Sequence, residues 1–372
     1  MNIAIDISPL RNANLLAHRV RGAGFYIENL RNALLKYFPE NKYIFFTSGE
    51  TLPAGRQDLP ENIDLVHYPY FEPFFLSLPI FVKYKTVVTV HDLTPLVFPK
   101  YFKVGIKGNL KWQIQKFALK NSKVIITDSE SSRKDVAKYA GIQKNKINVV
   151  YLAASDEFKK MDKSSILGSI REKYNLPENF VLYVGDVTWN KNLPRLIKAI
   201  KKINIPLVMV GKALLSKDFD KLNAWNKDLN EVQKLIENDR RIIRLGFVSQ
   251  DDLVSLYNLA TVFTMPSLYE GFGLPVLEAM NCGCPVVTTK EGSLSEIAGD
   301  AAYFVDAYDM DSIANGIKEV FLNTEIQKKI SQKGLLRAKE FTWEKTARET
   351  MNVYRSVSHE RTGANVIHIE GG

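Results

Sequence analysis

Two glutamates on either side of a glycine loop are the residues of this sequence best placed to do chemistry. Glu270 is followed by a two-glycine loop, by Pro275 and, eight residues after itself, by Glu278. Proline favours the first turn of a helix, so a helix is expected to begin near Pro275. Glu270 then lies just before the loop and Glu278 lies about one turn into the helix, so the two carboxylates flank a helix N-terminus.

The start of this expected helix suits a phosphate group. A helix N-terminus carries about half a positive charge and presents unpaired N–H groups. Carboxylates do not bind phosphate but accept hydrogen bonds from neutral hydroxyls, as sugars present them, so the segment predicts a site for a nucleotide-diphosphate sugar. The alternative is structural, because a glutamate in a first helical turn stabilises the helix by roughly 0.3–1 kcal/mol.

The same segment resembles the donor-site signature of retaining glycosyltransferases of family 4, which have the GT-B fold. The resemblance rests on Tyr-Glu-Gly-Phe-Gly-Leu-Pro at 269–275, on the Glu-x7-Glu spacing and on Cys-Gly-Cys-Pro-Val-Val at 282–287. Other matches are to the family's N-terminal glycine loop at 21–26, its His-Asp motif at 90–93, its phosphate-lysine region at 183–192 and its terminal helix at 341–344. The pattern is most similar to the bacterial mannosyltransferase-like branch.

The resemblance implies a role for each matched residue. Glu270 would bind hydroxyls of the transferred sugar, Glu278 the ribose, and Lys191 the leaving diphosphate. His91 would lie beside the reacting carbon and help to stabilise the oxocarbenium charge that develops there. The expected catalytic residues are His91, Lys191 and Glu270. The expected donor-binding residues are Gly22, Ala23, Gly24, Gly185, Lys191, Gly271, Phe272, Gly273, Leu274 and Glu278.

The phosphate-lysine region departs from the family pattern. The family commonly supports its lysine with an arginine just after the glycine or just before the lysine, where this chain has Asp186 and Asn190. The second phosphate partner is therefore unassigned, and Arg195 is one candidate. The structural alternatives are a solvated lysine at a helix start for Lys191 and a strand-end histidine for His91.

Short apolar strands alternate with helical patterns along the whole chain. The expected strands of the first half are Ile3–Asp6, Tyr43–Thr47, Leu65–His67, Thr86–Val90, Lys123–Thr127 and Ile147–Tyr151. Those of the second half are Val181–Gly185, Leu207–Gly211, Ile242–Leu245, Thr261–Met265, Pro285–Thr288 and Ala302–Val305. Such alternation predicts parallel sheets covered by helices on both faces. The fold class is therefore α/β, and the resemblance makes it GT-B, with two Rossmann-like domains facing across a cleft.

The domain limits follow from a polar stretch without strand character between residues 153 and 179. We expect an N-terminal, acceptor-side domain over residues 1–165 and a C-terminal domain that binds the nucleotide sugar over residues 170–340. A last helix over residues 342–358 has an apolar stripe. By resemblance, it crosses back to the first domain.

Two short motifs suggest other chemistry, which their context excludes, and a third is a helix cap. Gly22–Gly24 cannot be a dinucleotide fingerprint, because position 27 is isoleucine and the loop lies 16 residues past the first strand. Asp309-Met310-Asp311 imitates a metal motif, but helix capping explains it, and Ser293 with Glu296 forms an expected capping box. No metal and no cofactor are therefore expected.

Most of the positive charge lies in one block. Residues 101–150 carry 11 basic and 3 acidic side chains, which supplies +8 of the net charge of +9. Within residues 100–123 the lysines alternate with Tyr101, Phe102, Trp112 and Phe117, a pattern that favours an anionic membrane or acceptor surface. The alternative is a solvated helix that packs Leu110 and Phe117 inward.

The sequence points to the cytoplasm. The chain starts directly with a buried strand, without a signal peptide, and its longest apolar run, Phe74 to Val82, is too short to span a membrane. Cys282 and Cys284 are expected to be buried free thiols, as in a reducing compartment. We therefore expect a cytoplasmic protein with peripheral contact to the inner leaflet through residues 100–123.

The predicted function is transfer of a hexose, with mannose favoured, to a glycan or lipid-linked glycan in polysaccharide synthesis. The donor is expected to be GDP-mannose, the anomeric configuration to be retained, and the reaction to need no metal. Front-face departure is favoured, while a covalent intermediate on Glu270 remains an alternative. Two rival functions are a nucleotide-sugar epimerase or phosphorylase of the same fold, and a non-enzymatic binder of RNA or membranes. The binder leaves both glutamates without a role, and no nucleic-acid motif is present.

Overall fold

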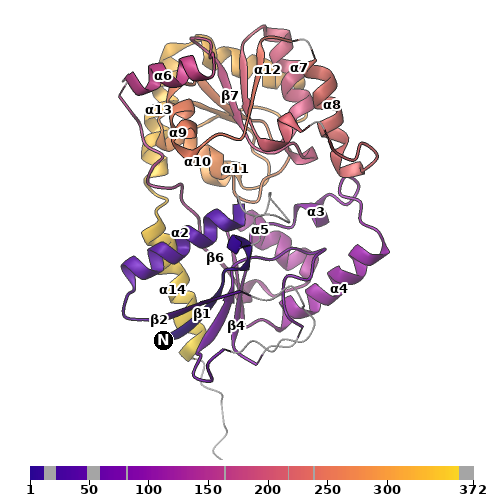
Figure 1. Cartoon of the computed structure of the whole chain (residues 1–372), viewed down its shortest axis with the longest axis vertical. Coiled ribbons are helices and arrows are strands. Elements are labelled where there is room, and N and C mark those ends of the chain that lie inside the picture. The colour runs from indigo at the N-terminus through magenta and orange to yellow at the C-terminus, as the bar shows by residue number, and fades with distance from the viewer. Residues whose placement is uncertain are drawn as a thin grey trace, which may run out of the picture.

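The computed structural model consists of two α/β units that lie one above the other (Figure 1). It describes residues 1–11, 22–47, 59–80, 83–162, 165–216, 218–237 and 239–359. Each unit contains one six-stranded parallel sheet. The two-sheet α/β architecture predicted from the strand–helix alternation is therefore confirmed.

The first sheet has the strand order β2-β1-β3-β4-β5-β6. Its strands are β1 (Asn2–Asp6), β2 (Lys42–Phe46), β3 (Leu65–Tyr68), β4 (Thr86–Val90), β5 (Val124–Thr127) and β6 (Ile147–Val149). All pairs are parallel, and in the central pair Val88 lies opposite Ile125. Both of these residues are fully buried, because helices cover both faces of the sheet.

The second sheet has the order β12-β11-β10-β7-β8-β9. Its strands are β7 (Val181–Val184), β8 (Leu207–Val210), β9 (Ile242–Gly246), β10 (Val262–Met265), β11 (Val286–Thr288) and β12 (Tyr303–Phe304). All twelve strands overlap the segments predicted from apolar runs, which confirms that prediction for both sheets.

Helices form layers on both sides of each sheet (Figure 1). Those of the first half are α1 (Ser8–Arg11), α2 (Gly22–Tyr37), α3 (Thr94–Val97), α4 (Ile106–Asn121) and α5 (Glu130–Asp135). Those that follow are α6 (Ser165–Lys173), α7 (Leu193–Ile203), α8 (Lys227–Ile236), α9 (Gln250–Leu259), α10 (Leu274–Asn281), α11 (Leu294–Ala298), α12 (Met310–Leu322), α13 (Thr324–Ala338) and α14 (Trp343–His359). In the second unit, α7, α8 and α12 lie on one side of β7, and α9, α10 and α13 lie on the other.

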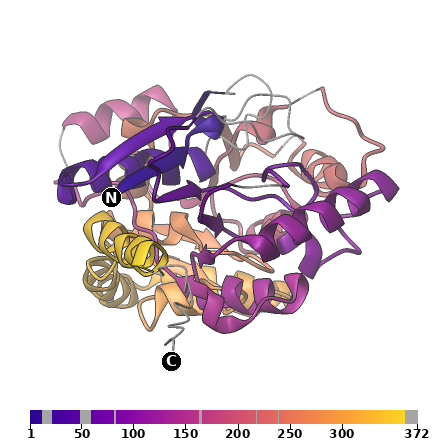
Figure 2. The same ribbon diagram turned by 90° about the horizontal axis from the view of Figure 1, so that it is seen from below.

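The last helix, α14, lies with the first sheet, although it follows the second in sequence (Figures 1 and 2). It packs against α2, β3 and β5. The ring of Trp343 lies edge-on to Phe25, and the Tyr354 hydroxyl lies 2.7 Å from Nδ1 of the buried His67. The apolar stripe of α14 therefore completes the core of the N-terminal unit.

The two units contact each other where the carboxyl ends of their strands meet. Phe98 lies edge-on to Tyr269, and Tyr101 stacks on Trp189 with ring centroids 3.7 Å apart. The Tyr151 hydroxyl donates to Glu296 at 2.7 Å. In open α/β sheets ligands bind at this end of the strands, so the contact region is where a site is expected.

Candidate active site

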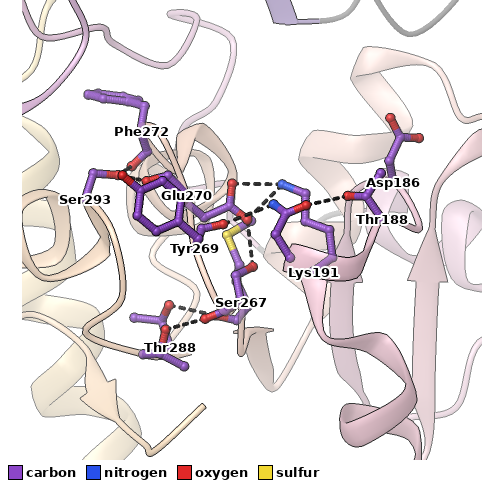
Figure 3. Close-up of polar contacts among 12 residues, drawn as sticks. Asp186, Thr188, Lys191, Ser267, Tyr269, Glu270, Phe272, Thr288 and Ser293 are labelled. Atoms are coloured by element: carbon purple, nitrogen blue, oxygen red, sulfur yellow. Dashed lines mark hydrogen bonds and ion pairs between the residues drawn. The ribbon is translucent and has the colours of Figure 1, made fainter. Parts of the chain in front are cut away.

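Glu270 and Lys191 form a largely buried ion pair at the end of the second sheet, with side chains 9% and 19% exposed (Figure 3). The Lys191 ammonium lies 2.8 Å from both Oε1 and Oε2 of Glu270, and Ser267 Oγ donates to Oε1 at 2.6 Å. Burial alone would lower the pKa of Lys191, but the charge and hydrogen bond of Glu270 outweigh it and raise the pKa. Two residues expected to bind different parts of the donor are thus in direct contact, and the lysine is held in its charged form.

The loop after Glu270 is fixed by Ser293 and by two glycines. Ser293 Oγ donates to the carbonyl groups of Glu270, at 3.1 Å, and of Phe272, at 2.7 Å. Gly273 has φ +97°, which side chains rarely adopt, and it directly precedes α10. A Cβ at Gly271 would lie 2.5 Å from Cβ of Asp92, so the glutamate loop touches the first domain through its backbone. The expected helix start is found, with α10 beginning one residue before Pro275.

Asn190 takes a structural role at one position where the family commonly has an arginine. Its side-chain amide donates to the Tyr269 carbonyl at 3.0 Å, and its backbone carbonyl accepts from the Leu268 N–H at 2.7 Å. Arg195 is bonded to the Asn192 side chain and to the Ala307 carbonyl. The bonds of Asn190 join the lysine loop to the segment just before Glu270, and Arg195 is engaged with groups outside the glutamate loop.

Glu278 points into the interior of the second domain. Its Oε2 accepts a hydrogen bond of 2.8 Å from the Tyr257 hydroxyl, and the residue is buried. Burial raises the pKa of Glu278 to about 7, although the bond from Tyr257 opposes the shift. The structure thus gives Glu278 a partner within its own domain, Tyr257, and its expected contact with the ribose stays a prediction.

His91 follows β4 in the first domain and is held by Asp128. The Asp128 Oδ2 atom lies 2.6 Å from Nδ1, and the ring lies edge-on to Tyr26. Nε2 is buried and has no hydrogen-bond partner among the residues that the structure describes. Burial lowers the pKa of His91, but Asp128 and, less strongly, Asp92 raise it above its ordinary value of 6.5. This leaves Nε2 as the ring atom with hydrogen-bonding capacity to spare.

The remaining predicted donor residues lie at element ends. Gly22, Ala23 and Gly24 form the first turn of α2, so the expectation of a glycine loop at these three residues was wrong. Position 21 lies outside the described residues. Gly185 directly follows β7, at the same end of the sheet as Lys191.

Of the two predicted capping motifs, one is confirmed and one is wrong. Asp309 caps α12 by accepting from the Asp311 N–H at 2.8 Å. Ser293 makes no side-chain cap bond on α11, because its hydroxyl binds the glutamate loop. Glu296 instead accepts from the Glu130 N–H at 2.8 Å and from Tyr151, both in the first domain. Among the described residues, no group of three or more His, Cys, Asp or Glu side chains could hold a metal ion.

Several residues of the site escaped the sequence analysis. They are Asp128, Ser129 and Ser132 after β5, with Tyr257 and Ser267 in the second domain, while Ser293 was named only as a helix cap. The one usable signal was position, since Asp128 and Ser129 follow a buried strand at the end of the sheet where ligands bind.

The aromatic residues of the basic segment 100–123 divide into packed and exposed ones. Tyr101 stacks on Trp189, Phe102 lies edge-on to Trp225, and Trp112 is buried. Leu110 and Phe117 are 62% and 53% exposed, so the alternative that packs them inward was wrong, and the contact with an anionic surface stays a prediction. Within the described ranges, no helix is long and apolar enough to cross a membrane.

Comparison with known families agrees with this geometry. Residues 168–337 match the model of glycosyl transferases group 1, and residues 16–157 match that of glycosyltransferase family 4. The second domain therefore corresponds to one model, which contains Glu270 and Lys191. The first corresponds to the other, which contains His91 and Asp128.

Individual relatives point the same way. The chain is 31% identical over 302 residues to the O-antigen chain mannosyltransferase B of Escherichia coli, covering 78% of this chain and 75% of that protein. It is 28% identical over 272 residues to the serotype-specific mannosyltransferase WbdA of E. coli. This alignment covers 72% of this chain and 33% of that protein. The structure of Anabaena HepE in complex with UDP-glucose superposes with a TM-score of 0.71 at 17% identity, covering 96% of this chain and 100% of that one. The chain therefore belongs to the GT-B glycosyltransferases of family 4, among its mannosyltransferase-like members.

Proposed function

We propose that the protein is a retaining mannosyltransferase that uses GDP-mannose as its donor. The observation that carries this proposal is the largely buried Lys191–Glu270 pair, with both N–O distances at 2.8 Å, beside a glycine loop that touches His91 and Asp92. A charged lysine at the start of the donor domain is suited to neutralise a departing diphosphate. The carboxylate beside it is suited to accept hydrogen bonds from sugar hydroxyls.

The environment of Glu270 favours departure and attack on the same face of the sugar. Both of its oxygens accept hydrogen bonds from Lys191, and one also accepts from Ser267. Such bonds stabilise the carboxylate and make it a poorer nucleophile. The proposed mechanism therefore uses Glu270 as an electrostatic and hydrogen-bonding group, and covalent capture of the sugar is the less favoured route.

The acceptor is proposed to be a glycan or a lipid-linked glycan. Two relatives are named as mannosyltransferases, and the first acts on the O-antigen chain. The bound UDP-glucose of HepE belongs to that protein and makes UDP sugars the competing donors to test.

The donor assignment predicts a selective thermal shift. GDP-mannose at about 100 times its dissociation constant should stabilise the protein by about 2.7 kcal/mol, which raises Tm by a few degrees. UDP-glucose should do so less, and turnover of the bound donor should survive a chelator and give the retained anomer. A larger shift with UDP-glucose would refute GDP-mannose as the donor. Turnover that needs manganese would refute metal independence, and a product of inverted anomeric configuration would refute retention. Conversion of the donor to its epimer, without transfer, would favour the epimerase.

We also propose that α4 is a membrane-facing element. Its outward side exposes Ile106, Leu110 and Phe117 to 89%, 62% and 53%, and the neighbouring loop exposes Phe75. Lys111 lies above the Phe75 ring at 5.8 Å. Further lysines of the segment 103–120 border this apolar side, and α4 runs along the outer edge of the N-terminal domain (Figure 1). Apolar side chains surrounded by lysines are complementary to an anionic bilayer.

Vesicle co-sedimentation tests the membrane contact. The protein should bind anionic vesicles at low salt, bind neutral ones weakly, and lose binding at high salt, since each basic residue contributes about 1 kcal/mol. Leu110→Ser with Phe117→Ser should reduce binding several-fold. Leu322→Ser with Leu336→Ser, which changes two exposed leucines of the second domain, is the matched control. Equal binding to both vesicle types, or equal loss in the control, would refute the contact.

A further inference from the structure

The segment that follows β5 holds His91 at two points. The Asp128 carboxylate lies 2.6 Å from Nδ1 of the ring. Ser132 Oγ lies 2.7 Å from the backbone carbonyl of His91, to which it donates a hydrogen bond. Both residues are buried, so water does not compete for these bonds. The ring and the backbone of His91 are thus oriented by a single short stretch of chain.

The same segment also holds the glutamate loop of the other domain. Ser129 Oγ donates to the Gly271 carbonyl at 2.6 Å, and Ser132 Oγ lies 3.2 Å from that carbonyl. Gly271 directly follows Glu270 in sequence. Ser132 is therefore within hydrogen-bond distance of the backbone beside both proposed catalytic groups, one from each domain.

The backbones of the two domains are in close contact at this point. A Cβ at Gly271 would lie 3.0 Å from the His91 carbonyl oxygen and 2.5 Å from Cβ of Asp92. Neither distance leaves room for a side chain. Hydrogen bonds from Ser129 and Ser132 at such a contact therefore set the separation of the two loops.

We propose that Asp128, Ser129 and Ser132 are positioning residues that align His91 with the Glu270 loop across the two domains. This inference rests on the proposed function, because it assigns those residues to the same reaction. The reacting groups come from different domains, so their alignment depends on the contact between them. A misplacement of about 1 Å can reduce the rate ~100-fold.

The first test removes the two hydroxyl groups. The Ser129→Ala/Ser132→Ala variant should lose roughly 10- to 100-fold in kcat, while its affinity for GDP, measured by calorimetry, changes less than about threefold. Ser129 also caps α5, so Ser249→Ala, which removes the equivalent cap of α9, is the matched control. A loss of kcat no larger than in the control, or an equal loss of GDP affinity, would overturn the alignment role.

The second test does not depend on turnover. In Asp128→Asn, His91 loses the carboxylate that raises its pKa most, while burial, Asp92, the Pro69 backbone and the nearby His67 remain. The pKa of His91, followed by NMR and assigned with His91→Gln among only five histidines, should fall. An unchanged pKa would overturn the role of Asp128 even if every nucleotide sugar failed as a donor. Failure of the wild type to turn over any donor, with the pKa shift present, would refute the proposed function alone.

Discussion

Replacing Glu270 by glutamine is expected to lower kcat by about 10²- to 10⁴-fold. Glutamine keeps the size of the side chain but removes the negative charge to which the Lys191 ammonium is bound, at 2.8 Å from each oxygen. Without that charge, burial dominates and the pKa of Lys191 falls, because Glu270 is the main group that raises it. The variant therefore loses the sugar ligand and weakens the group proposed to hold the leaving diphosphate.

Loss of stability must be separated from loss of chemistry in this variant. Breaking a buried ion pair costs about 3–5 kcal/mol, whereas replacing both partners by neutral groups costs less. Glu270→Gln/Lys191→Met should thus recover much of the melting temperature but none of the turnover. Glu325→Gln removes an exposed pair with Lys328 and should change neither quantity. A kcat of Glu270→Gln within threefold of the wild type would refute the catalytic role of Glu270.

Glu278→Gln is expected to stabilise the protein at about pH 8 while weakening nucleotide binding. The folded protein holds the pKa of Glu278 near 7, above its ordinary value of 4.5, because the carboxyl is buried. Its contribution to stability is therefore fully present below about pH 4.5 and is lost as the pH rises through 7. Glutamine does not ionise and can still accept from Tyr257, so the variant should gain up to about 3 kcal/mol at high pH.

The pH dependence of unfolding and the affinity for GDP are the two measurements for this variant. Loss of a charge-assisted bond to the ribose should weaken GDP binding by about 10- to 100-fold. Glu319→Gln is the matched control, because Glu319 accepts from the Tyr303 hydroxyl at 2.6 Å on the exposed surface. Wild-type and Glu278→Gln stabilities that run parallel between pH 5 and 8 would show that the buried carboxyl does not titrate in this range. Unchanged GDP affinity would exclude the ribose contact.

The strands were predictable because a buried strand has a locally apolar sequence. Parallel strands covered on both faces are nearly continuous apolar runs, and Thr86–Val90, with three valines, has this character without reference to any other part of the chain. The glycines and the proline of the loop likewise predicted the start of α10 to within one residue. Ends were less certain, and β12 is two residues shorter than its apolar run.

The glutamates, Lys191 and His91 were predictable as candidates, but their partners were not. Lys191 and Glu270 are 79 positions apart, and nothing local distinguishes a lysine that binds phosphate from one that pairs with a carboxylate. Glu296 has the spacing of a capping box, yet its carboxylate satisfies N–H groups of the other domain. The spacing of Glu296 could indicate only a local hydrogen bond at the start of α11. In the structure the carboxylate makes a longer-range bond instead.

The sequence by itself thus determined the α/β architecture, the order of the strands along the chain and the loop that carries Glu270. These depend on periodicity and on backbone chemistry within about ten residues. Only the tertiary structure decided that Asp128, Ser129 and Ser132 join His91 to that loop, and that Glu278 faces Tyr257 in the interior. The physical reason is that hydrogen bonds between distant segments depend on how the two sheets are placed relative to each other. That placement does not change the pattern of apolar and polar residues in either segment, so the sequence does not reveal it.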